Sequence, residues 1–335
     1  MTFPAPIGAD LQATDTLSAP MRVLVVSNME PSADAPQRGS FIRDQVAALR
    51  DLGIDVETFD WLPGTRRYPG AVRALRRLLA RRRYDVVHAH FGLAGACAAA
   101  AGAKPLIVTY HGTDVRHPLS GLFSRRLVHR DTFTAAASRA LFEPEGHRPG
   151  LPRRPGRAAV LPCGIDVERF RPIARERARA ELGLDPGGRY LLFPASPARP
   201  VKRHDRAAEL AGRVGAELLT LGATPPAEVP TWVNAAAAVL ITSDNEGFGM
   251  AAVEALACEV PVLSTPVGAV PFLLAGLPGC HVGPCDTATW EGPARACLED
   301  GQAIAGARQR ALAFGSVPLA ERVIAVYEEV SGRGY

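Results

Sequence analysis

Residues 243–254 read Ser-Asp-Asn-Glu-Gly-Phe-Gly-Met-Ala-Ala-Val-Glu, and this stretch identifies the class of fold. The apolar run Val239–Thr242 precedes it as a strand, and the apolar run Met250–Ala257 continues it as a helix. Gly247 and Gly249 let the backbone between them approach a ligand closely. The helix N-terminus then presents unpaired N–H groups and the positive end of its dipole to an oxyanion. A strand, a glycine turn and a helix in this order predict a parallel α/β sheet with an anion-binding turn.

Two acidic residues lie in this stretch. Glu246 is at the mouth of the turn, where it can accept hydrogen bonds from sugar hydroxyls. Glu254 is in the apolar helix, where a carboxylate is costly unless it is paired. The two vicinal hydroxyls of a ribose would supply that pairing, and a salt bridge to an arginine elsewhere in the chain is the alternative. For Glu246 and its glycines, the alternative is an ordinary turn.

A basic loop precedes this unit. The predicted strand Tyr190–Phe193 runs into a loop with Arg199 and Lys202, and only two of the 38 basic residues, Lys104 and Lys202, are lysines. A compact ammonium suits a phosphate oxygen in a tight pocket better than a planar guanidinium does. We therefore expect Arg199 and Lys202 to converge on a diphosphate leaving group without a metal ion. A solvated basic loop is the alternative.

Strands and helices alternate along the rest of the chain. Met21–Ser27 is a continuous apolar run, as expected for a strand covered on both faces. Further strands are predicted at Ile54–Phe59, Val86–His90, Leu106–Tyr110, Phe133–Ala135, Ala158–Leu161, Ala216–Leu221 and Val260–Ser264. This alternation predicts an α/β protein with two Rossmann-like, doubly wound parallel-sheet domains that face each other across a cleft. We expect a flexible extension over residues 1–20, a first domain over 21–168, a second over 169–315, and a helix over 316–335 that crosses back to the first domain.

Composition excludes several classes of protein. With 335 residues, of which 47% are hydrophobic, the chain can form two domains with cores of their own. We expect no signal peptide and no membrane span, and hence a cytoplasmic protein, because no basic segment followed by an apolar one opens the chain and no run nears about 18 apolar residues. Aromatic residues make up 6% and are not interleaved with the basic ones, which argues against nucleic acid as a partner. The six cysteines lack the spacing of a zinc site and are expected to be free thiols.

The charge is distributed unevenly. Residues 1–165 hold 22 Lys and Arg against 14 Asp and Glu, whereas the remaining residues hold 16 against 20. Arg66–Arg83 alone contains eight arginines, and four aliphatic residues share one side of the helix predicted there: Val72, Leu75, Leu78 and Leu79. Such a basic amphipathic helix can lie on an anionic membrane surface. The alternative is a helix that covers the sheet with its apolar side and exposes its arginines to water.

Several motifs together resemble a known family. The likeness rests on Glu246 and Glu254 with seven residues between them, on His111-Gly112-Thr113-Asp114 after a strand, and on the segments Pro162–Phe170 and Glu254–Val262. In this combination, over residues 21–330, the chain resembles the retaining glycosyltransferases of family 4, which have the GT-B fold. The loop Arg199–Lys202 looks closest to bacterial members that build teichuronic-acid-type or exopolysaccharide chains.

The resemblance implies a role for each matching residue. The expected catalytic residues are Glu246, which holds the donor sugar, His111, which lines the cleft near the reacting centre, and Arg199 and Lys202, which stabilise the departing diphosphate. The expected donor-binding groups are Glu254, for the nucleotide ribose, and the backbone of Gly247, Phe248, Gly249 and Met250. Gly39 and Asp114 are expected on the acceptor side of the cleft. A hydrogen-bonded core position is the alternative for His111.

The resemblance also implies a reaction. A sugar would pass from a nucleotide-diphosphate sugar, with UDP favoured over GDP, to a saccharide or lipid-linked acceptor in the synthesis of a cell-surface polysaccharide or glycoconjugate. No cofactor and no metal ion are expected, and a same-face displacement is favoured because no side chain stands out as a covalent nucleophile. Since acceptors of related enzymes are often lipid-linked, Arg66–Arg83 is expected to contact the inner face of the membrane peripherally. Two departures concern the acceptor side: Gly39 follows Arg38 where the family often has two glycines, and Cys163 replaces the asparagine of Pro-Asn-Gly.

Two other functions stay open at this point. A nicotinamide-dependent oxidoreductase would share the fold class, but Met21–Ser27 is followed by Asn28-Met29-Glu30-Pro31 and not by the glycine-rich turn G-x-G-x-x-G. A sugar-nucleotide sensor or scaffold without activity would keep the same binding residues. Only an assay of transfer separates such a protein from an enzyme.

Overall fold

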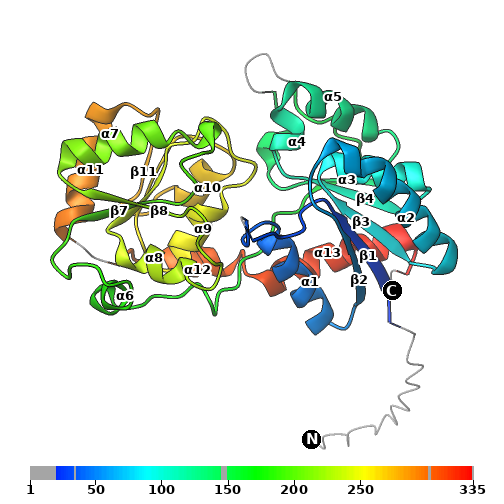
Figure 1. The fold of residues 1–335 in the computed structure, drawn as a ribbon, viewed down its shortest axis with the longest axis horizontal. Coiled ribbons are helices and arrows are strands. Elements are labelled where there is room, and N and C mark those ends of the chain that lie inside the picture. Colours follow the sequence, from blue (N-terminus) through cyan, green and yellow to red (C-terminus); the bar gives the residue numbers. More distant parts are fainter. Residues whose placement is uncertain (1–19, 34, 145–148, 301–302, 334–335) are drawn as a thin grey trace, which may run out of the picture.

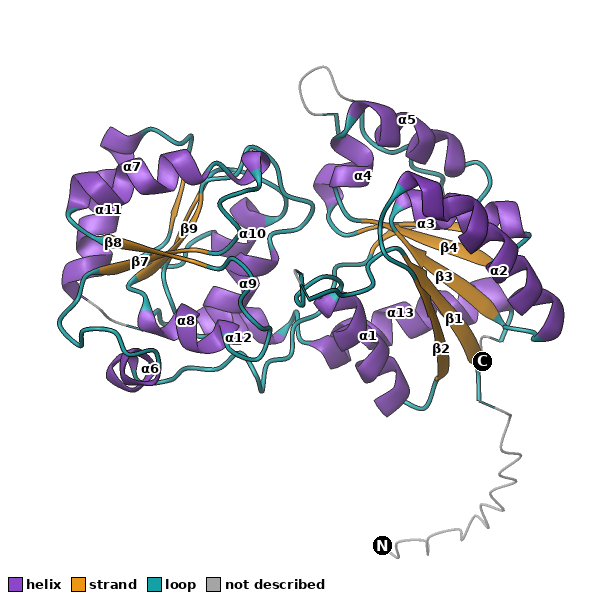
Figure 2. Cartoon of the chain, in the orientation of Figure 1, coloured by secondary structure: helices purple, strands orange, loops and turns teal. Residues whose placement is uncertain are grey.

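The chain forms two α/β domains that lie side by side, each with one parallel sheet between layers of helices (Figure 1). The computed structural model describes residues 20–33, 35–144, 149–300 and 303–333. The predicted flexible extension over residues 1–20 lies outside the described residues, except for Pro20. Helices and strands alternate in both domains, as Figure 2 shows.

The sheet of the first domain has six parallel strands in the order β2-β1-β3-β4-β5-β6. Their bounds are β1 Arg22–Ser27, β2 Asp55–Asp60, β3 Val86–His90, β4 Leu106–Tyr110, β5 Phe133–Ala136 and β6 Ala158–Val160. Leu24 and Val26 pack on one face of the sheet, and Val23 and Val25 pack on the other. The apolar run of β1 is therefore continuous because both faces of the strand are covered.

Two layers of helices cover this sheet. α2 (Tyr68–Arg81), α3 (Gly92–Ala101) and α5 (Pro118–Leu127) lie side by side on one face, and α1 (Ser40–Asp51) and α13 (Ser316–Ser331) lie on the other. The short helix α4 (Thr113–Arg116) precedes α5, and two 3-10 turns, η1 (Thr65–Arg67) and η2 (Arg139–Phe142), lie in loops. α3 packs closely between its neighbours, since a Cβ on Gly95 would come within 2.9 Å of side chains of Val108 and Leu127.

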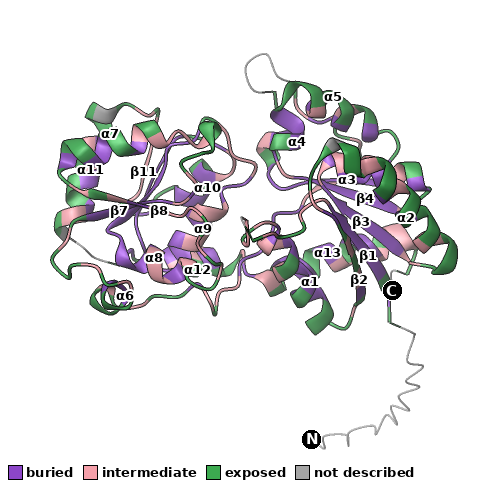
Figure 3. Ribbon diagram, in the orientation of Figure 1, coloured by how far each residue is buried: buried purple, intermediate pink, exposed green. Residues whose placement is uncertain are grey.

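The arginine-rich helix α2 buries its apolar side in the first domain. Leu75 is fully buried, and Val72, Leu78 and Leu79 are half-buried against the same core. The outer side of α2 is exposed (Figure 3). The structure therefore has the alternative arrangement given above, in which the helix covers the sheet with its apolar side and exposes its arginines. The apolar side of α2 is thus not available to a membrane surface. Within the described residues, no helix is both long and apolar enough to cross a membrane.

The sheet of the second domain has five parallel strands in the order β11-β10-β9-β7-β8. Their bounds are β7 Tyr190–Phe193, β8 Glu217–Thr220, β9 Ala238–Ile241, β10 Val262–Ser264 and β11 His281–Val282. α7 (His204–Val214) and α11 (Thr287–Asp300) cover one face, and α8 (Val229–Ala235), α9 (Met250–Ala257) and α12 (Ala307–Leu312) cover the other. α6 (Arg175–Glu181) packs against α8, and α10 (Val270–Leu274) packs against α9.

The chain passes between the domains twice, and the two passages pair with each other. The Ile165 N–H donates to the Phe314 carbonyl at 3.0 Å, and the Ser316 N–H donates to the Ile165 carbonyl at 2.8 Å. A glycine is needed beside them, because a Cβ on Gly164 would lie 2.6 Å from the Cα of Ser316. α13 then returns to the first domain, where the Tyr327 side chain is fully buried.

Candidate active site

The basic loop and the acidic turn predicted from the sequence meet at the carboxyl ends of β7 and β9. These two strands are neighbours, and the chain leaves them in opposite directions, from β7 to β8 and from β9 to β10. Parallel sheets bind their ligands in the crevice that such a switch in strand order opens. Lys202 follows β7 and Glu246 follows β9, so both belong to this crevice.

Lys202 and Glu246 form an ion pair that is largely shielded from water. The Lys202 ammonium donates to both carboxylate oxygens of Glu246, at 2.6 and 2.7 Å, and the two side chains are 16% and 15% exposed. The Ser243 hydroxyl donates to the Oε1 atom of Glu246 at 2.7 Å. The carboxylate has the chemistry to bind sugar hydroxyls, and the ammonium has the chemistry to bind phosphate oxygens.

The loop after β7 is fastened to the loop after β9. The Thr242 hydroxyl donates to the carbonyls of Lys202 and Arg203, at 3.1 and 2.9 Å. Arg203 has a φ of 55°, in the left-handed region, and turns the chain from the 3-10 helix η3 (Pro200–Lys202) into α7. Arg199 lies at the other end of η3 with an exposed side chain. The structure thus brings Lys202 to Glu246 and leaves Arg199 at the rim of the loop.

The helix α9 begins at this crevice without a side-chain cap. Its first residue, Met250, follows Gly249, whose φ of 111° favours glycine. No side chain caps the first turn, and the Ala252 N–H donates to the Gly249 carbonyl, so the N–H groups of Met250 and Ala251 are the ones available to an anion. The Phe248 side chain is buried and lies against Phe314, with 5.6 Å between the ring centroids. Among residues 247–250, ligand contacts are thus expected from the backbone.

The Glu254 carboxylate has no hydrogen-bond or salt-bridge partner within the part of the chain that the structure describes. Burial raises its pKa to about 7, against the lowering effect of Arg169. Arg169 is instead paired with Asp44 of α1, through contacts of 3.2 and 2.6 Å. The arginine salt bridge given above as the alternative for Glu254 is therefore not formed, and the carboxylate is open to a ligand.

The two domains touch at the turn that starts α9. A Cβ on Gly247 would lie 1.6 Å from the backbone oxygen of His111, and a Cβ on Gly112 would lie 2.7 Å from the Cα of Gly247. The Ser138 hydroxyl donates a hydrogen bond to the Gly247 carbonyl. The loops after β4 and β5 thus lie directly against the loop after β9, and the predicted residues His111 and Gly247 come together.

His111 lies at the end of a row of three histidines. His90 stacks between His88 and His111, with ring centroids 4.4 and 5.2 Å away. The His111 Nε2 atom lies 3.0 Å from His90 Nδ1, and its Nδ1 atom lies 3.8 Å from the Sγ atom of Cys163. Burial lowers the pKa of both His88 and His111 to about 3, and that of His90 well below its usual value. Both nitrogens of a neutral His111 therefore face protein groups, and its direct role in catalysis stays a prediction.

The two residues expected on the acceptor side hold loops in place. Asp114 is 6% exposed. Its carboxylate accepts three backbone hydrogen bonds at 2.9–3.0 Å, from the N–H groups of Gly92, His111 and Gly112. Gly39 has a φ of 68°, and a Cβ there would lie 2.7 Å from the Met29 carbonyl oxygen. Both residues shape loops of the first domain, and neither presents a free side chain to a ligand.

Four further residues of this region were not singled out from the sequence: Asp44, Ser138, Arg169 and Ser243. Arg169 lies inside the motif Pro162–Phe170, so its importance was signalled although its partner was not. Asp44 is 125 residues from Arg169, and Ser138 is 109 residues from Gly247, so no local pattern marks either of them. The described residues contain no group of three or more His, Cys, Asp or Glu side chains that could hold a metal ion, and all six cysteines, which lie within them, are free.

Comparisons with known proteins identify the family of the chain. A family model described as Glycosyltransferase Family 4 matches residues 21–169, and one described as Glycosyl transferases group 1 matches residues 195–300. D-inositol 3-phosphate glycosyltransferase 1 from Catenulispora acidiphila is 30% identical over 315 residues, which cover 75% of this chain and 74% of that protein. D-inositol 3-phosphate glycosyltransferase from Frankia alni is 30% identical over 301 residues, with 73% and 74% covered.

Solved structures share the fold. Sucrose-phosphate synthase from Thermosynechococcus elongatus superposes with a TM-score of 0.70 at 17% identity, over 94% of this chain and 100% of that one. HepE from Anabaena, solved with UDP and glucose, gives a TM-score of 0.68 at 17% identity, over 92% and 100%. Two parallel-sheet domains that meet at the carboxyl ends of their strands form the GT-B fold of glycosyltransferases. The chain belongs to glycosyltransferase family 4, as its motifs predicted. The predicted likeness to teichuronic-acid enzymes stays a prediction.

Proposed function

We propose that this glycosyltransferase takes its sugar from a nucleotide-diphosphate sugar and retains the configuration of the anomeric carbon. The proposal rests on the Lys202–Glu246 ion pair, which places a cation and an anion in one crevice beside the uncapped N-terminus of α9. In this reading Lys202 binds the diphosphate, Glu246 binds the donor sugar, and Glu254 binds the ribose. UDP-sugars are the first donors to test, because HepE has been solved with UDP-glucose.

Departure of the nucleotide creates negative charge on a phosphate oxygen. The Lys202 ammonium and the N–H groups at the start of α9 lie where they can stabilise this charge, and Arg199 reaches it from the rim of the loop. Glu246 is held by Lys202 and Ser243, which suits a residue that positions the sugar better than one that forms a covalent bond to it. We therefore propose that the acceptor hydroxyl attacks from the face that the nucleotide leaves, without a metal ion. The bond from the anomeric carbon to the diphosphate breaks as the new one forms, and the departing phosphate oxygen takes the hydroxyl proton.

The acceptor side of the proposal is broader. We propose a saccharide or lipid-linked acceptor in the synthesis of a cell-surface polysaccharide or glycoconjugate, made by a cytoplasmic enzyme whose exposed arginines in Arg66–Arg83 meet an anionic membrane. The relatives named above are D-inositol 3-phosphate glycosyltransferases, so a phosphorylated inositol is the second acceptor to test.

A panel of UDP-, GDP- and ADP-sugars tests the donor. Thermal unfolding and nucleotide release are recorded in parallel, with and without acceptors, for the wild-type chain and for Lys202→Ala and Glu254→Ala. We expect one nucleotide class to raise the unfolding temperature of the wild type and to be released slowly as free nucleotide. Both variants should lose this thermal shift, because each removes one of the groups that bind the donor.

Two controls complete the experiment. Glu299→Gln removes an exposed carboxylate from α11 and should keep the thermal shift. Addition of EDTA should leave the rate of nucleotide release unchanged, whereas loss of activity that Mg²⁺ or Mn²⁺ restores would refute a metal-independent reaction. A thermal shift without release, with every acceptor, would mean a sugar-nucleotide sensor, and no shift with any nucleotide would refute the proposed donor.

A further inference from the structure

The outer face of α5 is apolar, although nothing in the described residues covers it. Eight large hydrophobic side chains of the described residues are exposed, and three of them fall within five residues of α5: Leu119 (68% exposed), Leu122 (42%) and Phe123 (58%). The opposite face of the same helix is packed, since Gly121, Ser124 and Leu127 are buried. One side of α5 is therefore packed, whereas its outer side is apolar and is not covered by any described residue.

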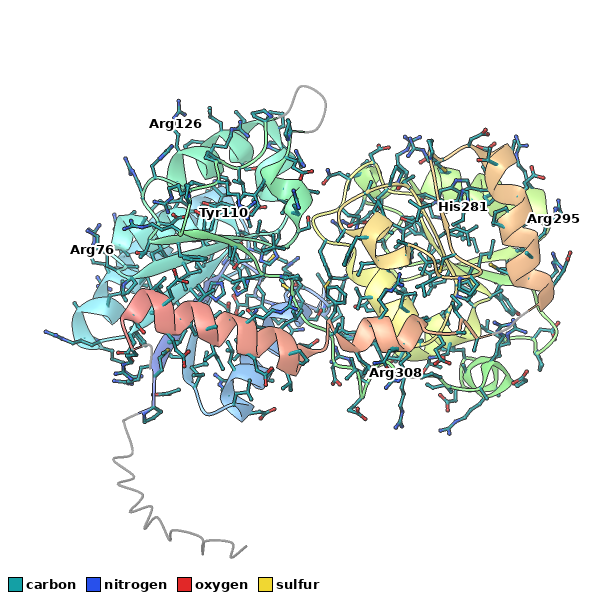
Figure 4. The ribbon with its side chains drawn as sticks, turned by 180° about the vertical axis from the view of Figure 1, so that it is seen from behind. Arg76, Tyr110, Arg126, His281, Arg295 and Arg308 are labelled. Atoms are coloured by element: carbon teal, nitrogen blue, oxygen red, sulfur yellow. The ribbon has the colours of Figure 1, made fainter. Side chains whose placement is uncertain are left out.

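The surroundings of this apolar patch are positively charged. Residues 115–130 contain four arginines and no Asp or Glu, and Arg126 and Arg130 at the end of α5 are exposed. α2, with its own exposed arginines, lies in the same layer of helices, separated from α5 by α3. Figure 4 shows Arg76 of α2 and Arg126 of α5 projecting outward from the surface of the first domain. The outer side of this layer of helices thus combines an apolar patch with positive charge.

We propose that α5 docks on an anionic lipid bilayer, with Leu119, Leu122 and Phe123 inserted at the boundary between head groups and acyl chains. The exposed arginines of α2 and α5 then lie against anionic head groups, which supply the opposite charge. A second copy of this chain fits less well, because a symmetric contact through this face would bring arginines against arginines. The insertion differs from the contact proposed above for Arg66–Arg83, where the apolar residues are used inside the core.

Docking through α5 would bring the candidate active site near the bilayer. α5 packs against α4, which starts in the loop His111–Asp114, and this loop touches Gly247 at the start of α9. Figure 1 shows α4 between α5 and the second domain. A lipid-linked acceptor would then reach the candidate active site from the surface to which the enzyme is bound. This part of the inference rests on the proposed transfer to a lipid-linked acceptor, whereas insertion of α5 into a bilayer does not.

Co-sedimentation of the full chain with lipid vesicles tests the docking. Wild type is compared with the triple variant Leu119→Gln, Leu122→Gln, Phe123→Gln, on vesicles of phosphatidylcholine with phosphatidylglycerol and on vesicles of phosphatidylcholine alone. We expect the wild type to bind the anionic vesicles, and the triple variant to bind them at least about tenfold more weakly, because it loses the inserted area. Binding to neutral vesicles should be much weaker for both proteins.

A matched control uses exposed apolar residues outside this layer: Leu52→Gln, Leu312→Gln and Val317→Gln in one chain. This control should bind anionic vesicles like the wild type, and both triple variants should keep the wild-type unfolding temperature and the wild-type rate of nucleotide release with a water-soluble acceptor. Wild-type binding by the α5 variant would overturn the inference. The inference would also be overturned if the wild type were a dimer, the α5 variant a monomer, and neither bound vesicles, since the patch would then join two copies. Failure of the proposed transfer reaction would appear in nucleotide release and not in vesicle binding.

Discussion

The two carboxylates of the family motif have opposite electrostatic surroundings. Glu246 is neutralised by Lys202 and by the Ser243 hydroxyl, so its charge is compensated before any ligand arrives. Glu254 lacks such a partner among the described residues, and burial raises its pKa to about 7. A charge without compensation reduces stability. We infer that Glu254 is kept for binding, because a neutral residue at this position would give a more stable helix.

The first prediction concerns the pH dependence of stability at Glu254. Its pKa is about 7 in the folded chain against 4.5 for an ordinary glutamate, so the folded state holds the proton more tightly than the unfolded state. The free energy of unfolding therefore falls as the pH rises from about 4.5 to about 7, by up to about 3 kcal/mol at 1.36 kcal/mol per pKa unit. Glu254→Gln stays neutral and should remove this loss.

Thermal unfolding at pH 5 and pH 8 measures the effect. We expect Glu254→Gln to unfold near the wild-type temperature at pH 5 and several degrees above it at pH 8. The exposed Glu299→Gln serves as control and should follow the wild type at both pH values. Equal unfolding temperatures of Glu254→Gln and wild type at pH 8 would show that the Glu254 carboxylate is already compensated in the folded chain.

At the scale of elements, the loops after β4 and β9 meet without room for one additional carbon atom. A Cβ on Gly247 would lie 1.6 Å from the His111 carbonyl oxygen. This oxygen belongs to the backbone, so it cannot move away as a flexible side chain could. Gly247→Ala must therefore separate the two loops or shift the start of α9. We expect it to lower kcat/KM at least about 100-fold, because misplacement by about 1 Å is enough for such a loss.

The same experiment needs a control glycine with free space. A Cβ on Gly212 in α7 would meet nothing within 4 Å, so Gly212→Ala should keep the wild-type kcat/KM and unfold at the same or a higher temperature. Gly247→Ala should keep an unfolding temperature close to that of the wild type, since each domain retains its own core. Wild-type kcat/KM in Gly247→Ala would mean that the closed contact between these loops is not used in catalysis.

Elements of this chain could be predicted where local patterns determine them. β3, β4, β7 and α9 lie at their predicted residues because apolar runs end at glycine, proline or a polar residue. The short strand β11 and the helices α5, α6, α8, α11 and α12 were not predicted, since their packing partners lie elsewhere in the chain. The Lys202–Glu246 pair could be foreseen from two loops at strand ends, whereas the Asp44–Arg169 pair depends on the docking of two domains.

At the scale of the whole molecule, the last helix belongs to the first domain. α13 follows the second domain in sequence, yet Ala320, Val323 and Val326 are buried with strands of the first sheet. The Tyr327 hydroxyl lies 2.7 Å from Nδ1 of His88, at the far end of the histidine row that includes His111. The two passages between the domains pair with each other at Ile165.

The final prediction follows from the packing of α13 on the first domain. Val323→Asp puts a charge without a partner into the core of the first domain and should lower the stability of that domain by at least about 3 kcal/mol. The second domain has its own core and should stay folded. Limited proteolysis with mass spectrometry should therefore give a persistent fragment of the second domain, between about residues 169 and 315. Ala325→Asp places the same charge on the exposed side of α13 and should be cleaved like the wild type. Loss of both domains at one rate in Val323→Asp would instead show that they unfold as a single unit.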